Sequence, residues 1–211
     1  MSIEIVFVLD RSGSMQGNQS DVIGGVNTLL DEQRKAGVHA TVSMFKFDTE
    51  YDEICRHIPL SEAKLDAADY VPRSATALMD AVGKTINMMG EDYAKSMSPP
   101  QGVMFVIFTD GMENASKEFH RGTIAKLIAQ QEKDWNWEFV YMGAHSDAFA
   151  ESSSMGVSGQ DVRGFAKTRG FAKSRQAFHD NYSDLSLQTV AYAAANNSAG
   201  DTTLGDGGSE G

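Results

Sequence analysis

Oxygen-bearing side chains alternate in a short motif near the start of the chain. Asp10, Ser12 and Ser14 belong to the segment Asp-Arg-Ser-Gly-Ser, which directly follows an apolar run. A loop of this pattern can turn alternate side chains to one side, so that a carboxylate and hydroxyls converge. Oxygen ligands suit a hard cation such as Mg²⁺, which binds six oxygens at roughly 2.0–2.1 Å and retains some waters. The same residues also cap loops and helices, so the motif alone leaves both interpretations open.

Later segments of the chain offer further oxygen ligands. Thr76 lies in the segment Ser-Ala-Thr-Ala-Leu at the predicted start of a helix, where a threonine also serves as an N-cap. Asp110 follows a second apolar run and precedes Gly111, an arrangement that an ordinary turn produces as well. Each of these residues, taken alone, has a purely structural explanation.

Taken together, the segments resemble the metal-ion-dependent adhesion site of von Willebrand factor A domains. The family pattern is Asp-x-Ser-x-Ser, then a distant Thr and a distant Asp. This sequence matches all of these positions, at Asp10, Ser12, Ser14, Thr76 and Asp110. The resemblance covers roughly residues 3–160. Its bare architecture is similar to the small stand-alone members of bacteria and their phages.

The resemblance implies a function as well as a fold. It implies a doubly wound sheet with Mg²⁺ at its carboxyl edge, although Mn²⁺ and Ca²⁺ accept the same oxygens. Ser12, Ser14 and Thr76 would bind the ion through hydroxyls, and Asp10 and Asp110 would bind it directly or through water. A partner protein would complete the octahedron with an Asp or Glu side chain. The expected function is therefore a metal-dependent protein-binding module.

The elements that position these residues can be predicted from hydrophobic patterns. Residues 3–9 and 102–109 are nearly continuous apolar runs, which are typical of buried strands in parallel sheets. Residues 38–47 and 51–58 are rich in strand-forming side chains and predict an antiparallel hairpin, and residues 137–142 predict another strand.

Apolar residues at helical spacing predict the helices between these strands. They are expected at 20–36, 76–89, 118–133 and 176–195, with a short helix at 61–70. Ser20 is the predicted N-cap of the first helix, and Gly37 its stop. The alternation predicts an α/β fold: a doubly wound, mostly parallel central sheet with one antiparallel edge strand and helices on both faces. Ligands of such sheets bind beyond the carboxyl ends of the strands.

The composition limits the classes of function. The 211 residues fit one α/β domain with a tail, and the formal net charge of −11 disfavours nonspecific binding to nucleic acid. No stretch reaches the length of a membrane span, and no basic region precedes the first apolar run. We therefore expect a cytoplasmic protein whose partners are neither nucleic acid nor membrane.

We expect the chain to divide into segments of different character. Residues 1–160 form the von Willebrand factor A-like core, and residues 161–197 form a basic repeat and a helix that pack on it. The repeat, GFAKTR-GFAKSR at 164–175, is either solvated or a docking patch for an acidic partner or a second copy. Residues 198–211 are Gly-rich and acidic, with too few apolar groups to fold.

Several other polar residues have open interpretations. Arg11 either faces solvent or contacts an acidic partner, and Glu113 and Asp48 lie near the predicted metal loops, either supporting them or solvated. The histidines show no zinc-like spacing and are interpreted as surface or partly packed residues, although His145 could line the rim of the site.

Two alternative functions deserve comparison. In a self-assembling protein, the acidic tail would supply the last metal ligand to a neighbouring copy, giving a homo-oligomer. An aspartate after the first strand is also found in phosphohydrolases that form an aspartyl-phosphate, but these need a second acidic residue where this chain has Ser12. We therefore expect a binding protein rather than an enzyme.

Overall fold

The first strand of the chain lies at the centre of the sheet. All of β1 (Ile3–Asp10) is buried, because parallel strands flank it on both sides: β2 (Ala40–Phe47) on one and β4 (Val103–Thr109) on the other. The computed structural model describes residues 2–109, 113–143, 155–156, 168–170 and 186–196.

The remaining strands extend the sheet to both edges. β3 (Tyr51–Pro59) pairs antiparallel with β2 at one edge, whereas β5 (Trp137–Gly143) and β6 (Thr168–Gly170) continue in parallel beyond β4. The six strands have the order β3-β2-β1-β4-β5-β6. The predicted doubly wound, mostly parallel sheet with an antiparallel edge strand is confirmed. The sequence pattern does not predict β6, which lies within the basic repeat at 164–175.

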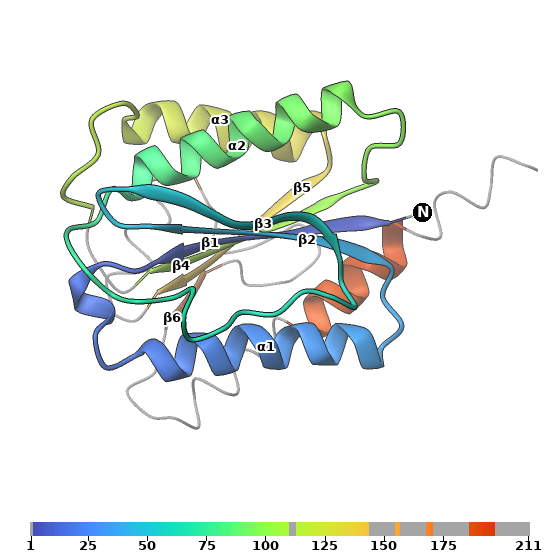
Figure 1. The fold of residues 1–211 in the computed structure, drawn as a ribbon. Coiled ribbons are helices and arrows are strands. Elements are labelled where there is room, and N and C mark those ends of the chain that lie inside the picture. The colour runs from blue at the N-terminus through green and yellow to red at the C-terminus, as the bar shows by residue number, and fades with distance from the viewer. Residues whose placement is uncertain (1, 110–112, 144–154, 157–167, 171–185, 197–211) are drawn as a thin grey trace, which may run out of the picture.

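Helices cover both faces of this sheet (Figure 1). α1 (Gln19–Lys35) and the helical residues 186–196 lie on one face, and α2 (Leu78–Lys95) and α3 (Arg121–Asp134) lie on the other. No helix within the described part of the chain is long and apolar enough to cross a membrane.

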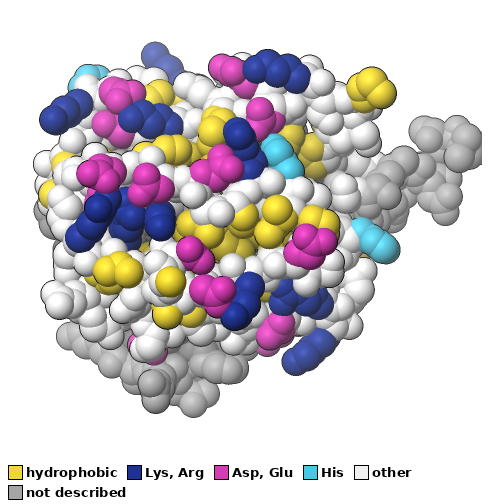
Figure 2. Space-filling view, viewed as in Figure 1, with side chains coloured by type: hydrophobic (Ala, Val, Ile, Leu, Met, Phe, Trp, Pro, Cys, Tyr) yellow, Lys and Arg dark blue, Asp and Glu magenta, His cyan; other side chains and the backbone are white. Residues whose placement is uncertain are grey.

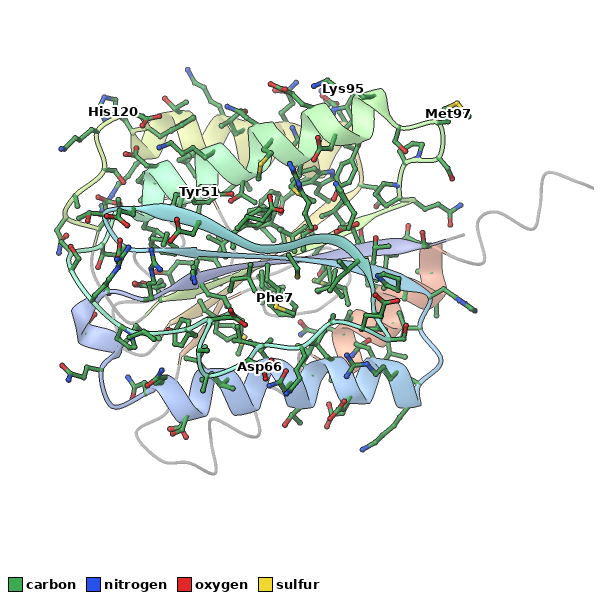
Figure 3. The ribbon with its side chains drawn as sticks, viewed as in Figure 1. Phe7, Tyr51, Asp66, Lys95, Met97 and His120 are labelled. Atoms are coloured by element: carbon green, nitrogen blue, oxygen red, sulfur yellow. The ribbon has the colours of Figure 1, made fainter. Side chains whose placement is uncertain are left out.

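Side chains of β1 alternate between two hydrophobic cores. Ile5 and Phe7 pack on the α1 side, and Val6 and Val8 pack on the α2 side. Figure 3 shows Phe7 pointing toward α1 and Tyr51 lying between the sheet and α2. Because each fully buried side chain of this size contributes about 1.5–3 kcal/mol, both faces of β1 hold its carboxyl end firmly in place.

The first helix and the segment after the hairpin differ in part from the predictions. Ser20 lies inside α1 rather than capping it, but Gly37 follows the helix with a left-handed φ of 70°, as a stop residue should. Residues 61–70 form turns instead of a helix. The side chain of Asn27 exchanges hydrogen bonds with the backbone of Leu65 at 2.8 and 2.9 Å, replacing bonds that a helix would make within itself.

The second helix continues to Lys95, well beyond its predicted end. Its last turns are polar, but Tyr93 packs edge-on against Trp137 with ring centroids 5.8 Å apart. This contact holds the last turns of α2 against β5, although their sequence lacks the apolar spacing that predicts a helix.

Two glycines of α2 form a matched pair for a stability test. A Cβ on Gly83 would overlap the ring of Phe119, whereas a Cβ on Gly90 would meet nothing within 4 Å. We expect Gly90→Ala to raise the free energy of unfolding by about 0.5–1 kcal/mol, as in an open helix position. Gly83→Ala should lower it, because overpacking costs about 1–3 kcal/mol. Chemical denaturation measures both, and equal effects would show that Phe119 moves away freely.

Candidate metal centre

The Asp-x-Ser-x-Ser loop starts at the carboxyl end of β1. Asp10 is fully buried, and its carboxylate accepts hydrogen bonds from the backbone N–H of Ser12 at 2.7 Å and the hydroxyl of Thr109 at 2.6 Å. A 3-10 turn over Gly13–Met15 follows, and the hydroxyl oxygens of Ser12 and Ser14 lie 3.0 Å apart. The structure therefore brings the serine hydroxyls together, as the motif predicts.

This spacing fits neighbouring positions of an octahedral ion. Two oxygens that each lie about 2.1 Å from one ion, at right angles, are about 3.0 Å apart; the hydroxyl oxygens of Ser12 and Ser14 have this separation, 3.0 Å. Among the described residues, no three His, Cys, Asp or Glu side chains converge as metal ligands. The hydroxyl oxygens of Ser12 and Ser14 are therefore candidate ligands beside the Asp10 carboxylate.

Thr76 lies in the loop that leads into α2, and this loop is joined to the Asp10 loop through its backbone. Thr76 itself is only 3% exposed. The N–H of Gly13 donates to the carbonyl of Ser74 at 2.8 Å, and the N–H of Arg73 donates to the carbonyl of Arg11 at 2.6 Å. Ser74 has a φ of 58°, a backbone conformation that residues other than glycine rarely adopt. Strained backbone therefore lies at the contact between the loops.

Asp110 lies outside the described residues, but the residues on both sides of its loop bind the other predicted ligands. Thr109 donates its hydroxyl to Asp10. The side chain of Asn114 accepts the N–H of Thr76 at 3.0 Å, and the N–H of Asn114 donates to the carbonyl of Thr76 at 3.1 Å. The loop that carries Asp110 is thus tied to the Asp10 loop at one end and to Thr76 at the other.

Glu113 caps the start of α2. Its carboxylate accepts the N–H of Met79 at 2.9 Å and the N–H of Ser116 at 2.7 Å. A carboxylate at this position satisfies free N–H groups of the helix and complements the positive end of its dipole. Of the two interpretations, supporting residue or solvated residue, the structure supports the first.

Asp80, in the first turn of α2, binds the backbone of the segment that follows Glu113. Its carboxylate accepts the N–H groups of Lys117, Glu118 and Phe119 at 2.9, 2.9 and 2.8 Å. Burial alone would raise the pKa of Asp80, but these bonds to its charged form outweigh burial and hold the pKa below its usual value. Helix and loop therefore fix each other at the edge of the candidate site.

Arg11 does not face solvent, so that interpretation is wrong. Its side chain is 7% exposed and forms ion pairs with Asp48 at 3.3 Å and with Asp52 at 2.6 Å. Asp48 is fully buried and pairs with Arg73 at 2.6 Å as well. Figure 2 shows that positive and negative side chains are interspersed over the face in view. Arg11 therefore ties the Asp10 loop to the β2–β3 hairpin, and its charge is paired within the chain.

The structure adds supporting residues that sequence patterns did not single out. The buried hydroxyl of Tyr70 donates to the carbonyl of Asp10, and Thr109 and Asn114 make the bonds described above. Thr109 and Asn114 lie close to Asp110 in the sequence, and their proximity to a predicted ligand is a usable signal. Tyr70 carries no such signal, because its loop has no regular pattern. His145 lies outside the described residues.

Comparisons with known proteins show the fold. No protein-family model matches the sequence, and no curated protein matches it. Solved structures do match. A von Willebrand factor type A protein from Catenulispora acidiphila is 10% identical, with 90% of this chain and 42% of that chain covered and a TM-score of 0.64. The PilB minor pilin from Streptococcus sanguinis is 15% identical, with 90% and 61% covered and a TM-score of 0.63.

A further match is proximal thread matrix protein 1 from the mussel byssus. It is 16% identical, with 91% of this chain and 48% of that chain covered and a TM-score of 0.65. Another structure of that protein has a zinc-occupied metal-ion-dependent adhesion site. The chain spans about half the length of these proteins. Identities this low show a shared fold alone, and this chain therefore has a von Willebrand factor A-like α/β fold.

Replacing Asp80 tests the support around the candidate site. Asp80→Asn removes the charge that binds three backbone N–H groups, and we expect a loss of about 1–3 kcal/mol in the free energy of unfolding at neutral pH. Because the folded-state pKa is depressed, this contribution is present above the unfolded-state pKa of about 3.9 and is lost as pH falls through the folded-state value. Urea unfolding between neutral pH and pH 3 measures both effects. The exposed Asp31→Asn is the control, and equal losses in the two variants would contradict the prediction.

Proposed function

We propose that this chain is a divalent-metal-dependent protein-binding module of the adhesion type. The metal, Mg²⁺ in our proposal, is held by Asp10, Ser12, Ser14, Thr76 and Asp110. The observation that carries the proposal is the direct bonding between the motif loops. The Asp110 loop is bonded to Asp10 through Thr109 and to Thr76 through Asn114.

The burial of the proposed ligands suggests where a partner would approach. Asp10, Ser12 and Thr76 are 0, 1 and 3% exposed, whereas Ser14 is exposed. An ion bound by these groups would face solvent on the side of Ser14. Because neutral hydroxyls leave the charge of the ion poorly balanced, that open side would favour a carboxylate from the partner, an Asp or Glu side chain.

The comparisons support this class of function without naming the partner. The matched proteins include a minor pilin and a byssal matrix protein, which suggests binding and assembly rather than catalysis. One of them holds zinc at its adhesion site. The proposed ligands are all oxygens, which favours a hard cation such as Mg²⁺ over zinc. Mn²⁺ and Ca²⁺ also accept oxygen ligands. The cytoplasmic location, the absence of nucleic-acid and membrane partners and the formation of a homo-oligomer stay predictions.

Metal binding can be measured directly on the purified chain. A ligand that binds only the folded state at about 100 times its Kd raises the free energy of unfolding by about 2.7 kcal/mol. We expect Mg²⁺ or Mn²⁺ to give a saturable stabilisation of the wild type and to lose this effect in Ser12→Ala. The control is Ser20→Ala, which removes an exposed serine of α1. A wild type that does not respond to either metal, or a Ser12→Ala variant that responds fully, would contradict the proposed site.

Partner binding requires a separate experiment. Wild type and Asp110→Ala are used to capture proteins from host lysate, each with Mg²⁺ and with EDTA. We expect a protein that is retained by wild type in Mg²⁺ and lost in the other three arms, since the partner carboxylate needs the bound ion. Equal recovery in all arms would show that the metal site does not mediate binding.

A further inference from the structure

A buried carboxylate interrupts the apolar face of β1 at the end opposite to the metal loop. Glu4 is 1% exposed and lies on the same side of the strand as the core residue Val6. Its carboxylate accepts hydrogen bonds from the hydroxyls of Thr41 and Ser43 on β2, the latter at 2.6 Å. Burial of a charged group is tolerated only when such bonds satisfy it. The neighbouring strand has therefore placed hydroxyls where the rest of this face is apolar.

His57 provides a further contact to this carboxylate from the edge strand. It has a φ of 52°, and the pairing of β2 with β3 is irregular near it. Its backbone N–H donates to the hydroxyl of Ser43 at 2.9 Å. The left-handed conformation is costly for a residue other than glycine and persists only where surrounding contacts hold it.

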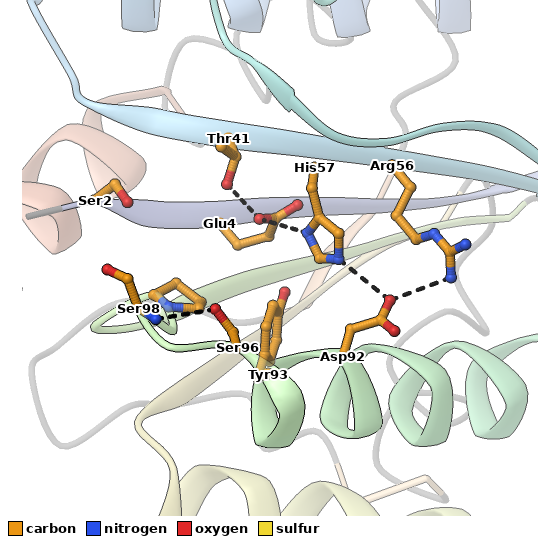
Figure 4. Close-up of a pocket in the computed structure, with 10 residues that line it drawn as sticks. Ser2, Glu4, Thr41, Arg56, His57, Asp92, Tyr93, Ser96 and Ser98 are labelled. Atoms are coloured by element: carbon orange, nitrogen blue, oxygen red, sulfur yellow. Dashed lines mark hydrogen bonds and ion pairs between the residues drawn. The ribbon is translucent and has the colours of Figure 1, made fainter.

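The ring of His57 lies between two carboxylates from different elements (Figure 4). Its Nδ1 is 3.2 Å from Glu4 on β1, and its Nε2 is 3.2 Å from Asp92 on α2. Since His57 itself belongs to β3, one imidazole joins three elements. This junction forms part of the wall of a pocket of about 510 Å³ between the sheet and the end of α2.

The other charged and titratable groups around the ring come from α2 and β3. Arg56 pairs with Asp92 at 3.2 Å and with Glu53 at 3.2 Å. Tyr93 lies beside the imidazole, with ring centroids 5.7 Å apart, and burial raises the pKa of its hydroxyl far above neutral pH. Cys55, the other titratable group of this part of β3, also has a pKa raised by burial, to about 11. Among the side-chain types in this cluster, histidine is the one whose ordinary pKa lies nearest neutral pH, so His57 is the group expected to act as a switch.

The protonation state of His57 decides whether both contacts can exist together. A protonated imidazole donates from both nitrogens, whereas a neutral one has a single N–H. In the neutral state one carboxylate must face a nitrogen lone pair. Glu4 is buried and held by β2 hydroxyls, while Asp92 is 30% exposed and has Arg56 as a second partner. The contact to Asp92 is therefore the one that breaks.

We propose that His57 is a proton-dependent clamp, which fastens the last turns of α2 to β1 and β3 when charged and loosens this pocket when neutral. The clamp does not depend on a bound metal. The three elements it joins extend to the candidate metal centre at their other ends. β1 ends at Asp10, and α2 begins just after Thr76. Asp52, near the start of β3, pairs with Arg11.

The direction of the pH effect follows from the contacts. The hydrogen bond to Glu4, with smaller contributions from Asp92, raises the pKa of His57 against the opposing effect of burial. A raised folded-state pKa means that the stabilisation is fully present below the unfolded-state value of about 6.5. It is lost as pH rises through the folded-state pKa. The clamp is therefore closed in mildly acidic solution and opens toward alkaline pH.

Hydrogen exchange across pH 6 to 9, corrected for intrinsic rates, tests the clamp in the full chain. We expect protection of the amides in the last turns of α2 to fall several-fold as pH rises in the wild type. His57→Asn keeps the left-handed backbone accessible and retains a donor for Glu4, but it is too short to reach Asp92 and does not titrate. The protection of α2 in this variant should be low across the whole range, without the fall between pH 6 and 9 that is expected for the wild type. His39→Asn, which removes an exposed histidine, should behave as wild type.

A second pair of variants keeps the proposal testable if His57→Asn does not fold. Asp92→Asn removes one carboxylate of the clamp, whereas Glu91→Gln removes the adjacent charge, which pairs with Lys95 at 3.2 Å. We expect Asp92→Asn alone to lower the protection of α2 at pH 6 and to shift the NMR titration of His57 downward. Wild-type protection that does not change with pH, or an Asp92→Asn variant indistinguishable from Glu91→Gln, would overturn the proposal.

Discussion

The buried carboxylate of Asp10 is the constraint on which the arrangement of the loops depends. A charge without solvent must be satisfied by hydrogen bonds, and this one receives bonds from the backbone of Ser12 and the hydroxyl of Thr109. These donors come from the two strand ends that meet at the centre of the sheet. Satisfying one carboxylate therefore fixes the ends of β1 and β4 relative to each other, with Tyr70 holding the carbonyl of the same residue.

The start of α2 is the second fixed point. Glu113 caps the helix from the loop, and Asp80 binds the loop from the helix, so each carboxylate satisfies backbone groups of the other segment. Free N–H groups at a helix start are satisfied by anionic side chains at little cost. Because Thr76 and Asn114 are bonded within the same junction, this proposed ligand is positioned by residues outside the proposed ligand set.

A second buried carboxylate, at the opposite end of β1, is likewise satisfied by hydrogen bonds. Glu4 accepts bonds from β2 and from His57, whose ring also contacts Asp92. Both ends of β1 thus carry a buried acid that links it to neighbouring elements, whereas the residues between them are apolar. A minor pilin and a byssal protein have a similar fold at identities of 15 and 16%. A buried strand requires a pattern of apolar residues rather than particular ones.

The sequence by itself determined the features that local patterns encode. Nearly continuous apolar runs predicted the central strands, a polar turn predicted the hairpin, and the spacing of Asp and Ser predicted a loop of converging oxygens. Only the tertiary structure decided how distant residues pair. Arg11 pairs with Asp48, which follows the end of the neighbouring strand. Asn27 binds the backbone of the segment 61–70, which was expected to be a helix. His57 contacts Glu4 at a separation of 53 residues. These contacts are set by strand order and by the direction in which each side chain leaves the sheet, and neither quantity is expressed in the local pattern of the chain.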